Sequence, residues 1–238
     1  LGGMAHTEPQ CDQVSPDLLD EVVAEFDDIS FSEMAARLGY PRFDGQVRDP
    51  LLVLADLPLS VFVTTSYHGF LEAALKRAGK APRIAFCRWR SGGDKTSSIL
   101  DGDYEPSRAE PLVYHLYGFD EYPDSMVLTE DDYVEFLVAI ARDANQPRID
   151  PIHAYVRRVM SSRSLVLLGY DLYSWDFRAL FWGLIKPRSQ DVLGFSIQLE
   201  KDAVEKTYLS KYLQNANFEV YWGDVPQFTR ELYQALRT

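Results

Sequence analysis

Three segments of the chain end an apolar run in polar residues of types that can bind a ligand or move a proton. They are VFVTTSYHG, LVYHLYG and SLVLLGYDL, and their polar ends are Thr64–His68, His115–Gly118 and Gly169–Leu172. In open α/β sheets, ligands bind at the carboxyl ends of the strands, which is where such polar residues fall. Each polar end taken singly is also explained as a cap of the following helix. The prediction of a ligand site therefore rests on the three ends together.

Two imidazoles belong to these ends, His68 and His115. An unperturbed histidine has a pKa near 6.5 and therefore suits general-base chemistry at neutral pH. His115 precedes Tyr117 by two residues, so a continuous strand would direct both side chains to the same face. The structural alternative for His115 is packing within the sheet. The alternative for His68 is capping or solvation at the start of the next helix.

The elements that position these ends alternate between strand and helix. Strands are predicted at residues 61–65, 83–89, 111–116, 164–170, 191–199 and 218–223. Helical patterns separate them, and further helices are predicted before the first strand, including LLDEVVAEF after Ser15 and Pro16. This alternation predicts an α/β fold: a doubly wound, mostly parallel Rossmann-like sheet with helices on both faces. We expect one domain over residues 1–238.

The amino-acid composition and charge limit the kinds of partner that we expect the protein to bind. The 238 residues carry a formal charge of −12, which disfavours binding to nucleic acid and to anionic membranes. No apolar run is long enough to span a bilayer, and the two separated cysteines, Cys11 and Cys87, suit a reducing cytoplasm. Leu1-Gly2-Gly3 precedes Met4, which leads us to expect that a first strand is missing and that the domain is part of a larger protein.

The three strand ends, in this order, resemble the sirtuin-like (silent information regulator type) domains. The segments VLTEDDY and GYDLYSWDFRAL resemble its bacterial branch, whose members hydrolyse NAD in defence against phage, and the likeness runs from about residue 47 to the end. This resemblance implies NAD as the ligand and hydrolysis to ADP-ribose and nicotinamide as the activity. Zinc is not expected, because two separated cysteines cannot form the four-cysteine site of the deacylases.

The resemblance also implies roles for individual residues. The nucleotide-binding positions are Gly2, Gly3, Thr64, Thr65, Gly118, Gly169, Tyr170 and Asp171. The catalytic positions are Ser66, His68 and Tyr117, with His115 as a substitute base. Four of these residues differ from the family pattern: Ser66 replaces an asparagine, His68 an aspartate, Tyr117 a histidine and Asp171 a serine.

These substitutions leave two functions open. One is an NAD hydrolase in which His115 or His68 acts as base and Ser66 orients water, held inactive until a partner or assembly orders the long loop 90–111. The other is an inactive domain that serves as a scaffold, an oligomerisation module or a nucleotide sensor. Protein partners or self-association are expected in either case. A Rossmann dehydrogenase is a weaker third reading, because no G-x-G-x-x-G follows a first strand.

Several other residues are expected to be structural. Trp175, Phe177, Phe181 and Trp182 recur at a helical period and are predicted to fill the core. Glu130, Asp131 and Asp132 are expected to stabilise a helix start rather than bind a metal. Cys87 is expected to be a small core residue.

Overall fold

The computed structural model describes residues 31–37, 39–41, 43, 49–90, 98–142, 151–170, 175–185, 193–199 and 203–235. Its strands are β1 (Val61–Thr64), β2 (Arg83–Phe86), β3 (Leu112–His115), β4 (Leu165–Leu167), β5 (Gly194–Gln198) and β6 (Phe218–Trp222). Its α-helices are α2 (Phe31–Arg37), α3 (Pro50–Asp56), α4 (Phe70–Arg77), α5 (Glu130–Arg142), α6 (Ala154–Ser162), α7 (Trp175–Leu180), α8 (Ala203–Gln214) and α9 (Val225–Ala235).

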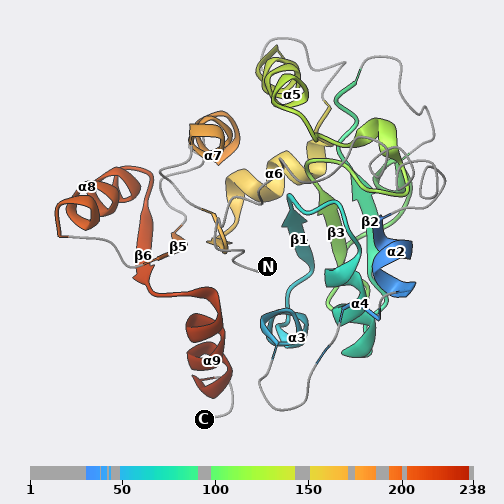
Figure 1. Cartoon of the computed structure of the whole chain (residues 1–238), viewed down its shortest axis with the longest axis horizontal. Helices are drawn as coiled ribbons and strands as arrows, with labels where there is room; N and C mark the ends of the chain where they lie inside the picture. Colours follow the sequence, from blue (N-terminus) through green and yellow to red (C-terminus); the bar gives the residue numbers. More distant parts are fainter. Residues whose placement is uncertain are drawn as a thin grey trace, which may run out of the picture.

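The strands form two parallel sheets, with β3 between β1 and β2 in one and β5 between β4 and β6 in the other (Figure 1). All of the predicted strands are therefore present, and the α/β fold is confirmed. The two groups are not hydrogen-bonded to each other through the described strands, so the single continuous sheet that the alternation predicts is divided between β1 and β4.

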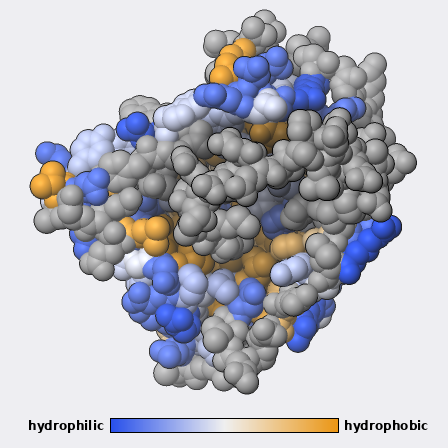
Figure 2. All heavy atoms as spheres, viewed as in Figure 1, coloured by the Kyte–Doolittle hydropathy of each residue, from blue (hydrophilic) through white to orange (hydrophobic). Residues whose placement is uncertain are grey.

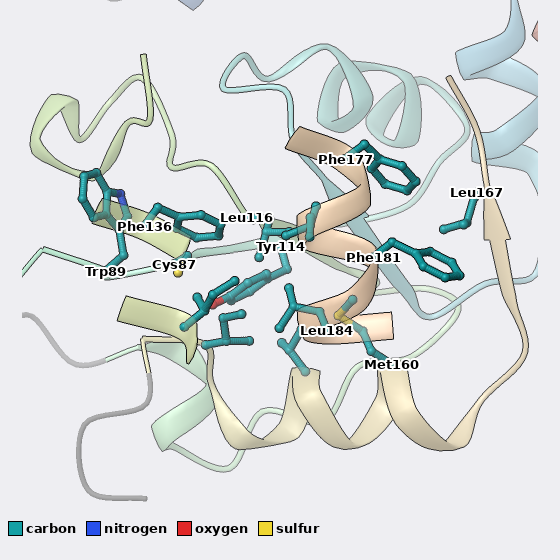
Figure 3. Close-up of a cluster of buried hydrophobic side chains, with 14 of the residues drawn as sticks. Cys87, Trp89, Tyr114, Leu116, Phe136, Met160, Leu167, Phe177, Phe181 and Leu184 are labelled. Carbon is teal, nitrogen blue, oxygen red and sulfur yellow. The ribbon is translucent and has the colours of Figure 1, made fainter. Parts of the chain in front are cut away.

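Helices cover both faces of the first sheet. Side chains along β3 alternate in direction, so β3 has apolar residues that pack against helices on each face. Val113 packs with Phe62, Ala74 and Leu75 on the side of α3 and α4. Leu112 and Tyr114 face the other way, into the larger core that α5, α6 and α7 complete. Figure 3 shows this core, with Phe136, Met160 and Leu184 around Tyr114. The strand ends are thus held between two packed layers.

Helix starts follow local capping chemistry. The Asp49 side chain accepts the amide of Leu51 at 2.8 Å at the start of α3. Thr129 and Asp132 exchange side-chain-to-backbone hydrogen bonds of 3.1 and 3.0 Å at the start of α5, which forms a capping box. The expectation that the acidic residues stabilise this helix start is confirmed for Asp132.

The expected aromatic core is right in part. Phe177 and Phe181 are buried and project on the side of Leu167, as Figure 3 shows. Trp175 is 52% exposed, so its assignment to the core is wrong; it lies at the first turn of α7 with its ring edge against Tyr133. The helix that contains these residues continues beyond α7 as a π-helical turn, Phe181–Ile185. The side chain of Trp182 lies outside the described residues.

Cys87 is fully buried in the larger core, as expected. Within the long loop, Ile99–Asp101 forms a 3₁₀ turn, and a capping box on Ser98 begins this turn. Residues 91–97 of that loop lie outside the described residues.

Candidate functional site

The end of β1 turns sharply into α4. The Thr64 hydroxyl accepts the amide of Ser66 at 3.0 Å, which fixes the turn directly after the strand. Gly69 then caps α4, and its amide donates to the hydroxyl of Ser32 at 3.1 Å. The hydroxyl of Thr64 therefore has a structural role, whereas the Ser66 hydroxyl makes no hydrogen bond to a described residue and can reach a ligand.

The ends of β1 and β4 meet through two hydroxyl groups. Thr65 Oγ1 and Tyr170 Oη lie 3.4 Å apart and can share a hydrogen bond. Burial raises the pKa of Tyr170, so the phenol stays neutral at physiological pH. Phe177 stacks on the Tyr170 ring with centroids 4.4 Å apart, and the Gln198 amide donates to the Tyr170 carbonyl at 2.8 Å. Two strand ends that are 105 residues apart in sequence thus form one edge.

Gly169 introduces this second end. Its φ of +77° lies in the left-handed region, which a glycine adopts without the steric cost of a Cβ atom. This turn changes the chain direction after β4 and brings Tyr170 toward Thr65.

His115 is held on both ring nitrogens. Nδ1 lies 2.7 Å from the Ser66 carbonyl, and Nε2 lies 2.7 Å from Glu72 Oε1. The side chain is 0% exposed, and that of Glu72 is 3% exposed. A carbonyl only accepts, so Nδ1 must donate to it. His115 therefore packs in the sheet, as its structural alternative predicted, and in this arrangement offers no nitrogen to a ligand.

Tyr117 and His115 do not face the same way. Tyr117 packs edge-on against Tyr133 and Phe136 of α5, with centroids 5.8 and 5.4 Å away, whereas His115 faces α4. The prediction of a shared face is wrong because β3 ends at His115 and the chain turns before Tyr117. Tyr117 and His115 are therefore not brought together.

Gly118 has a structural reason to be glycine. Its φ is +87°, and a Cβ atom placed there would lie 2.2 Å from the carbonyl oxygen of Ser125. The chain needs this close approach because the Tyr117 carbonyl accepts the amide of Val127 at 2.9 Å. The contact fixes the turn after β3.

Of the two histidines at the predicted strand ends, His68 is the one that borders a cavity. It lines a cavity of about 1150 Å³ together with Thr65, Ser66 and Tyr170. Its ring packs on Phe70 with centroids 4.0 Å apart. Burial lowers the pKa of His68 from its ordinary value, which favours the neutral imidazole with a lone pair on one ring nitrogen.

The cavity divides the expected residues into two groups. Thr64, Thr65, Ser66, His68, Gly169 and Tyr170 line it. His115, Tyr117 and Gly118 do not belong to its lining, and Gly2, Gly3 and Asp171 lie outside the described residues.

Sequence reasoning missed two sets of residues around this cavity. Arg158 and Arg163 line its far end, near the amino end of β4, and no motif marks them. Asp120 is 3% exposed; it accepts the Ser32 amide at 2.5 Å, and its own amide donates to the Tyr67 carbonyl at 3.0 Å. Its position two residues after Gly118 is its sequence signal. Asp120 ties α2 to the turn that carries Ser66 and His68.

The described ranges hold neither a metal-binding cluster nor a membrane-spanning helix. Among them, no three or more histidine, cysteine, aspartate or glutamate side chains are arranged to hold a metal ion. None of the helices described has the length and apolar character needed to cross a membrane.

Comparison with known families identifies the fold. The family model of the SIR2-like domain matches residues 60–221, which is more than half of the 238 residues. The chain therefore belongs to the SIR2-like domain family, and the sirtuin-like resemblance of its strand ends is confirmed. This family connects the domain to NAD-related functions. No curated protein matches the chain.

Proposed function

We propose that this domain binds an NAD-type dinucleotide in the cavity at the ends of β1 and β4. The observation that carries the proposal is the contact between Thr65 and Tyr170, which closes one edge of a cavity of about 1150 Å³. The cavity is somewhat larger than the about 300–1,000 Å³ that is common for ligand cavities, so it has room for a ligand as large as a dinucleotide. The family match supports NAD as its chemical class.

Within this proposal the residues act by binding. The hydroxyls of Thr65, Ser66 and Tyr170 offer donors and acceptors to ribose hydroxyls, and the neutral phenol of Tyr170 adds no charge that would repel a phosphate. His115 does not act on the ligand. It holds the Ser66 carbonyl at 2.7 Å and so positions the turn.

Of the candidate functions, nucleotide binding without catalytic turnover is the one that the site supports best. A base that takes a proton needs an accepting nitrogen facing the reacting atoms. Both nitrogens of His115 are engaged, and Tyr117 packs on α5 instead of lining the cavity. The domain would then be a nucleotide sensor.

NAD hydrolysis is the second candidate, and His68 is the observation that favours it. His68 lines the cavity beside Ser66, and its lowered pKa leaves a neutral imidazole. In this reaction the oxygen of a water bonds to the ribose carbon as the carbon–nitrogen bond to nicotinamide breaks. Nicotinamide leaves with the electron pair, and His68 accepts the proton of the water. The resemblance to the bacterial branch would make this a defence activity.

Thermal shift and product analysis on the same samples separate the two candidates. The sensor proposal expects the melting temperature to rise with NAD and with ADP-ribose, since a ligand that binds only the native state stabilises it. It also expects NAD to stay intact by chromatography. Steady release of nicotinamide that His68→Ala abolishes and His153→Ala preserves would instead establish hydrolysis. His153 is a suitable control because it caps α6 outside the cavity lining. No thermal shift with either nucleotide would contradict both candidates.

A further inference from the structure

Helix α5 exposes one face that combines valines with carboxylates. Val134 and Val138 are large apolar side chains, and both are exposed. Asp131 and Glu135 are exposed as well. With the spacing i, i+3, i+4 and i+7, these four residues share one face of the helix, and we call them the acidic stripe. Phe136 lies on another face and is buried in the larger core, so the acidic stripe faces solvent.

Helix α8 exposes a face with the same spacing. Val204 is 80% exposed and Tyr208 is 53% exposed. Thr207 and Lys211 are also exposed and follow the same i, i+3, i+4 and i+7 pattern, and we call these four residues the basic stripe. Leu209 lies on the other side of the helix and is buried in the larger core. Helix α8 therefore presents one apolar face to the core and a second one to solvent.

The two stripes belong to separate parts of the surface. In Figure 1, α5 lies at the top of the molecule and α8 lies at its left edge. Figure 2, in the same view, shows hydrophobic surface over both helices, with hydrophilic surface beside it in each place. The acidic stripe and the basic stripe of one copy therefore do not cover each other.

The charges of the two stripes are opposite. The acidic stripe carries the carboxylates of Asp131 and Glu135, and the basic stripe carries the ammonium group of Lys211. None of the ion pairs between described residues includes these three side chains. The other charges of α8, on Glu205 and Lys206, are half-buried and of opposite sign. Because the whole chain carries a charge of −12, two copies repel each other over most of their surfaces, and a lysine that meets carboxylates favours one particular contact.

The two stripes match when the helices are antiparallel. Asp131 and Val138 are seven residues apart, as are Val204 and Lys211, which corresponds to about 10 Å along each helix. In the antiparallel orientation, Lys211 lies beside Asp131 at one end and Val204 lies beside Val138 at the other. Tyr208 then covers the middle of the acidic stripe. Charges and apolar side chains are therefore paired along the whole length of both stripes.

We propose that the acidic stripe on α5 of one copy of this chain binds the basic stripe on α8 of a second copy, with the two helices antiparallel. The contact joins two different surfaces, so it is head-to-tail, and each copy keeps one stripe for a further copy. A contact between two helix faces is small, and the association is therefore weak and depends on concentration. None of the residues of the two stripes lines the cavity proposed for the nucleotide, so this inference does not depend on nucleotide binding.

Sedimentation velocity of the whole chain without nucleotide tests the proposal. We expect the weight-average sedimentation coefficient of the wild type to rise over a series from about 1 µM to about 1 mM. Lys211→Glu places a carboxylate against the acidic stripe, and Asp131→Lys places an ammonium group against Lys211. Each substitution should weaken the association about tenfold or more, because like charges then face each other.

Two comparisons separate this contact from general charge repulsion. Lys76 is exposed on α4, and Lys76→Glu changes the net charge as Lys211→Glu does, but it should associate like the wild type. Asp131→Lys makes the chain less negative, so general repulsion predicts stronger association for this variant, whereas the proposed contact predicts weaker association.

Charge exchange identifies the two partners. The double variant Asp131→Lys/Lys211→Glu reverses both charges and should associate like the wild type. A mixture of the two single variants in equal amounts should also associate, since every contact between unlike copies then joins opposite charges. Val204→Ser removes an apolar contact without a change in charge and should weaken the association as well. Melting temperatures at low protein concentration should stay close to that of the wild type, because all of these residues are exposed.

Three results would overturn the proposal. A wild-type chain that stays monomeric up to about 1 mM would show that the stripes do not bind each other. Equal weakening by Lys76→Glu and Lys211→Glu would assign the association to net charge. Association that neither the double variant nor the mixture restores would show that Asp131 and Lys211 do not face each other.

Discussion

His115 Nε2 lies 2.7 Å from Glu72 Oε1, with both side chains shut off from solvent. Since the other ring nitrogen donates to the Ser66 carbonyl, one proton must be shared along the contact between His115 and Glu72. The contact links α4, β3 and the turn after β1 through three groups. It therefore positions the turn that carries Thr65 and Ser66 rather than offering a base to a ligand.

Removal of Glu72 should destabilise the fold strongly. Loss of one partner of a buried pair leaves the other buried and unpaired, which costs about 3–5 kcal/mol. We expect Glu72→Ala to lower the free energy of unfolding by that amount in urea denaturation. Glu135→Ala is the control, because Glu135 is exposed on α5. Equal losses for the two variants would contradict a structural role of the pair.

Two glycines with similar backbone angles should respond differently to alanine. Gly79 has a φ of +79° and nothing within 4 Å of a built Cβ atom, so Gly79→Ala introduces strain alone and should cost about 1 kcal/mol. At Gly118 the added Cβ would also meet the Ser125 carbonyl oxygen at 2.2 Å. Thermal unfolding should show a clearly larger loss for Gly118→Ala. A loss no larger than that of Gly79→Ala would mean that the turn relaxes freely.

The capping box of α5 should be sensitive to acid. The pKa of Asp132 is lowered to about 2, chiefly because its carboxylate accepts the Thr129 amide. A depressed carboxyl pKa contributes stability above the unfolded value near 3.8 and loses it as the pH falls toward 2. Asp132→Ala should cost about 1 kcal/mol at neutral pH.

The difference in stability between wild type and Asp132→Ala should shrink between pH 4 and pH 2, a range that follows from the pKa of Asp132. Asp131→Ala is the matched control in the same helical turn, and it should show neither effect. A stability difference that stays constant between pH 4 and pH 2 would contradict a cap that depends on the ionised carboxylate of Asp132.

Tyr104 should make the protein sensitive to alkali. Burial raises the pKa of Tyr104 to about 12, and its hydroxyl donates to the Glu110 carbonyl at 2.9 Å. A raised pKa gives stability that is fully present below the unfolded value of 10 and is lost as the pH rises toward 12. Urea midpoints measured from pH 9 upward should fall more for wild type than for Tyr104→Phe. Parallel pH profiles would contradict the assignment.

The sequence predicts the strands and the convergence of two strand ends correctly, because apolar runs and helix caps are local features. Thr65 and Tyr170 meet as expected of neighbouring ends at one edge of an α/β fold. The direction of Tyr117 is not predicted, because it depends on the residue at which β3 ends. Strand alternation no longer applies beyond His115.

The burial of a side chain depends on long-range contacts, which the helical period of the sequence does not predict. The helical period groups Trp175 with Phe177, but only the packing of α5 and β4 decides which of them is covered. Likewise, nothing local marks Glu72 as the partner of His115, because 43 residues separate them. A buried glutamate in the first turn of an amphipathic helix resembles an ordinary favourable charge at that position.

Calorimetric titration of NAD into the wild-type domain and Tyr170→Phe tests the proposed site most directly. Wild type should bind saturably, and Tyr170→Phe should bind about tenfold more weakly, because it lacks the hydroxyl that contacts Thr65. Tyr155→Phe removes a hydroxyl from the α6 side of the same cavity and should keep the wild-type affinity. Equal affinities for all three proteins, or no binding to the wild type, would contradict a nucleotide site at the ends of β1 and β4.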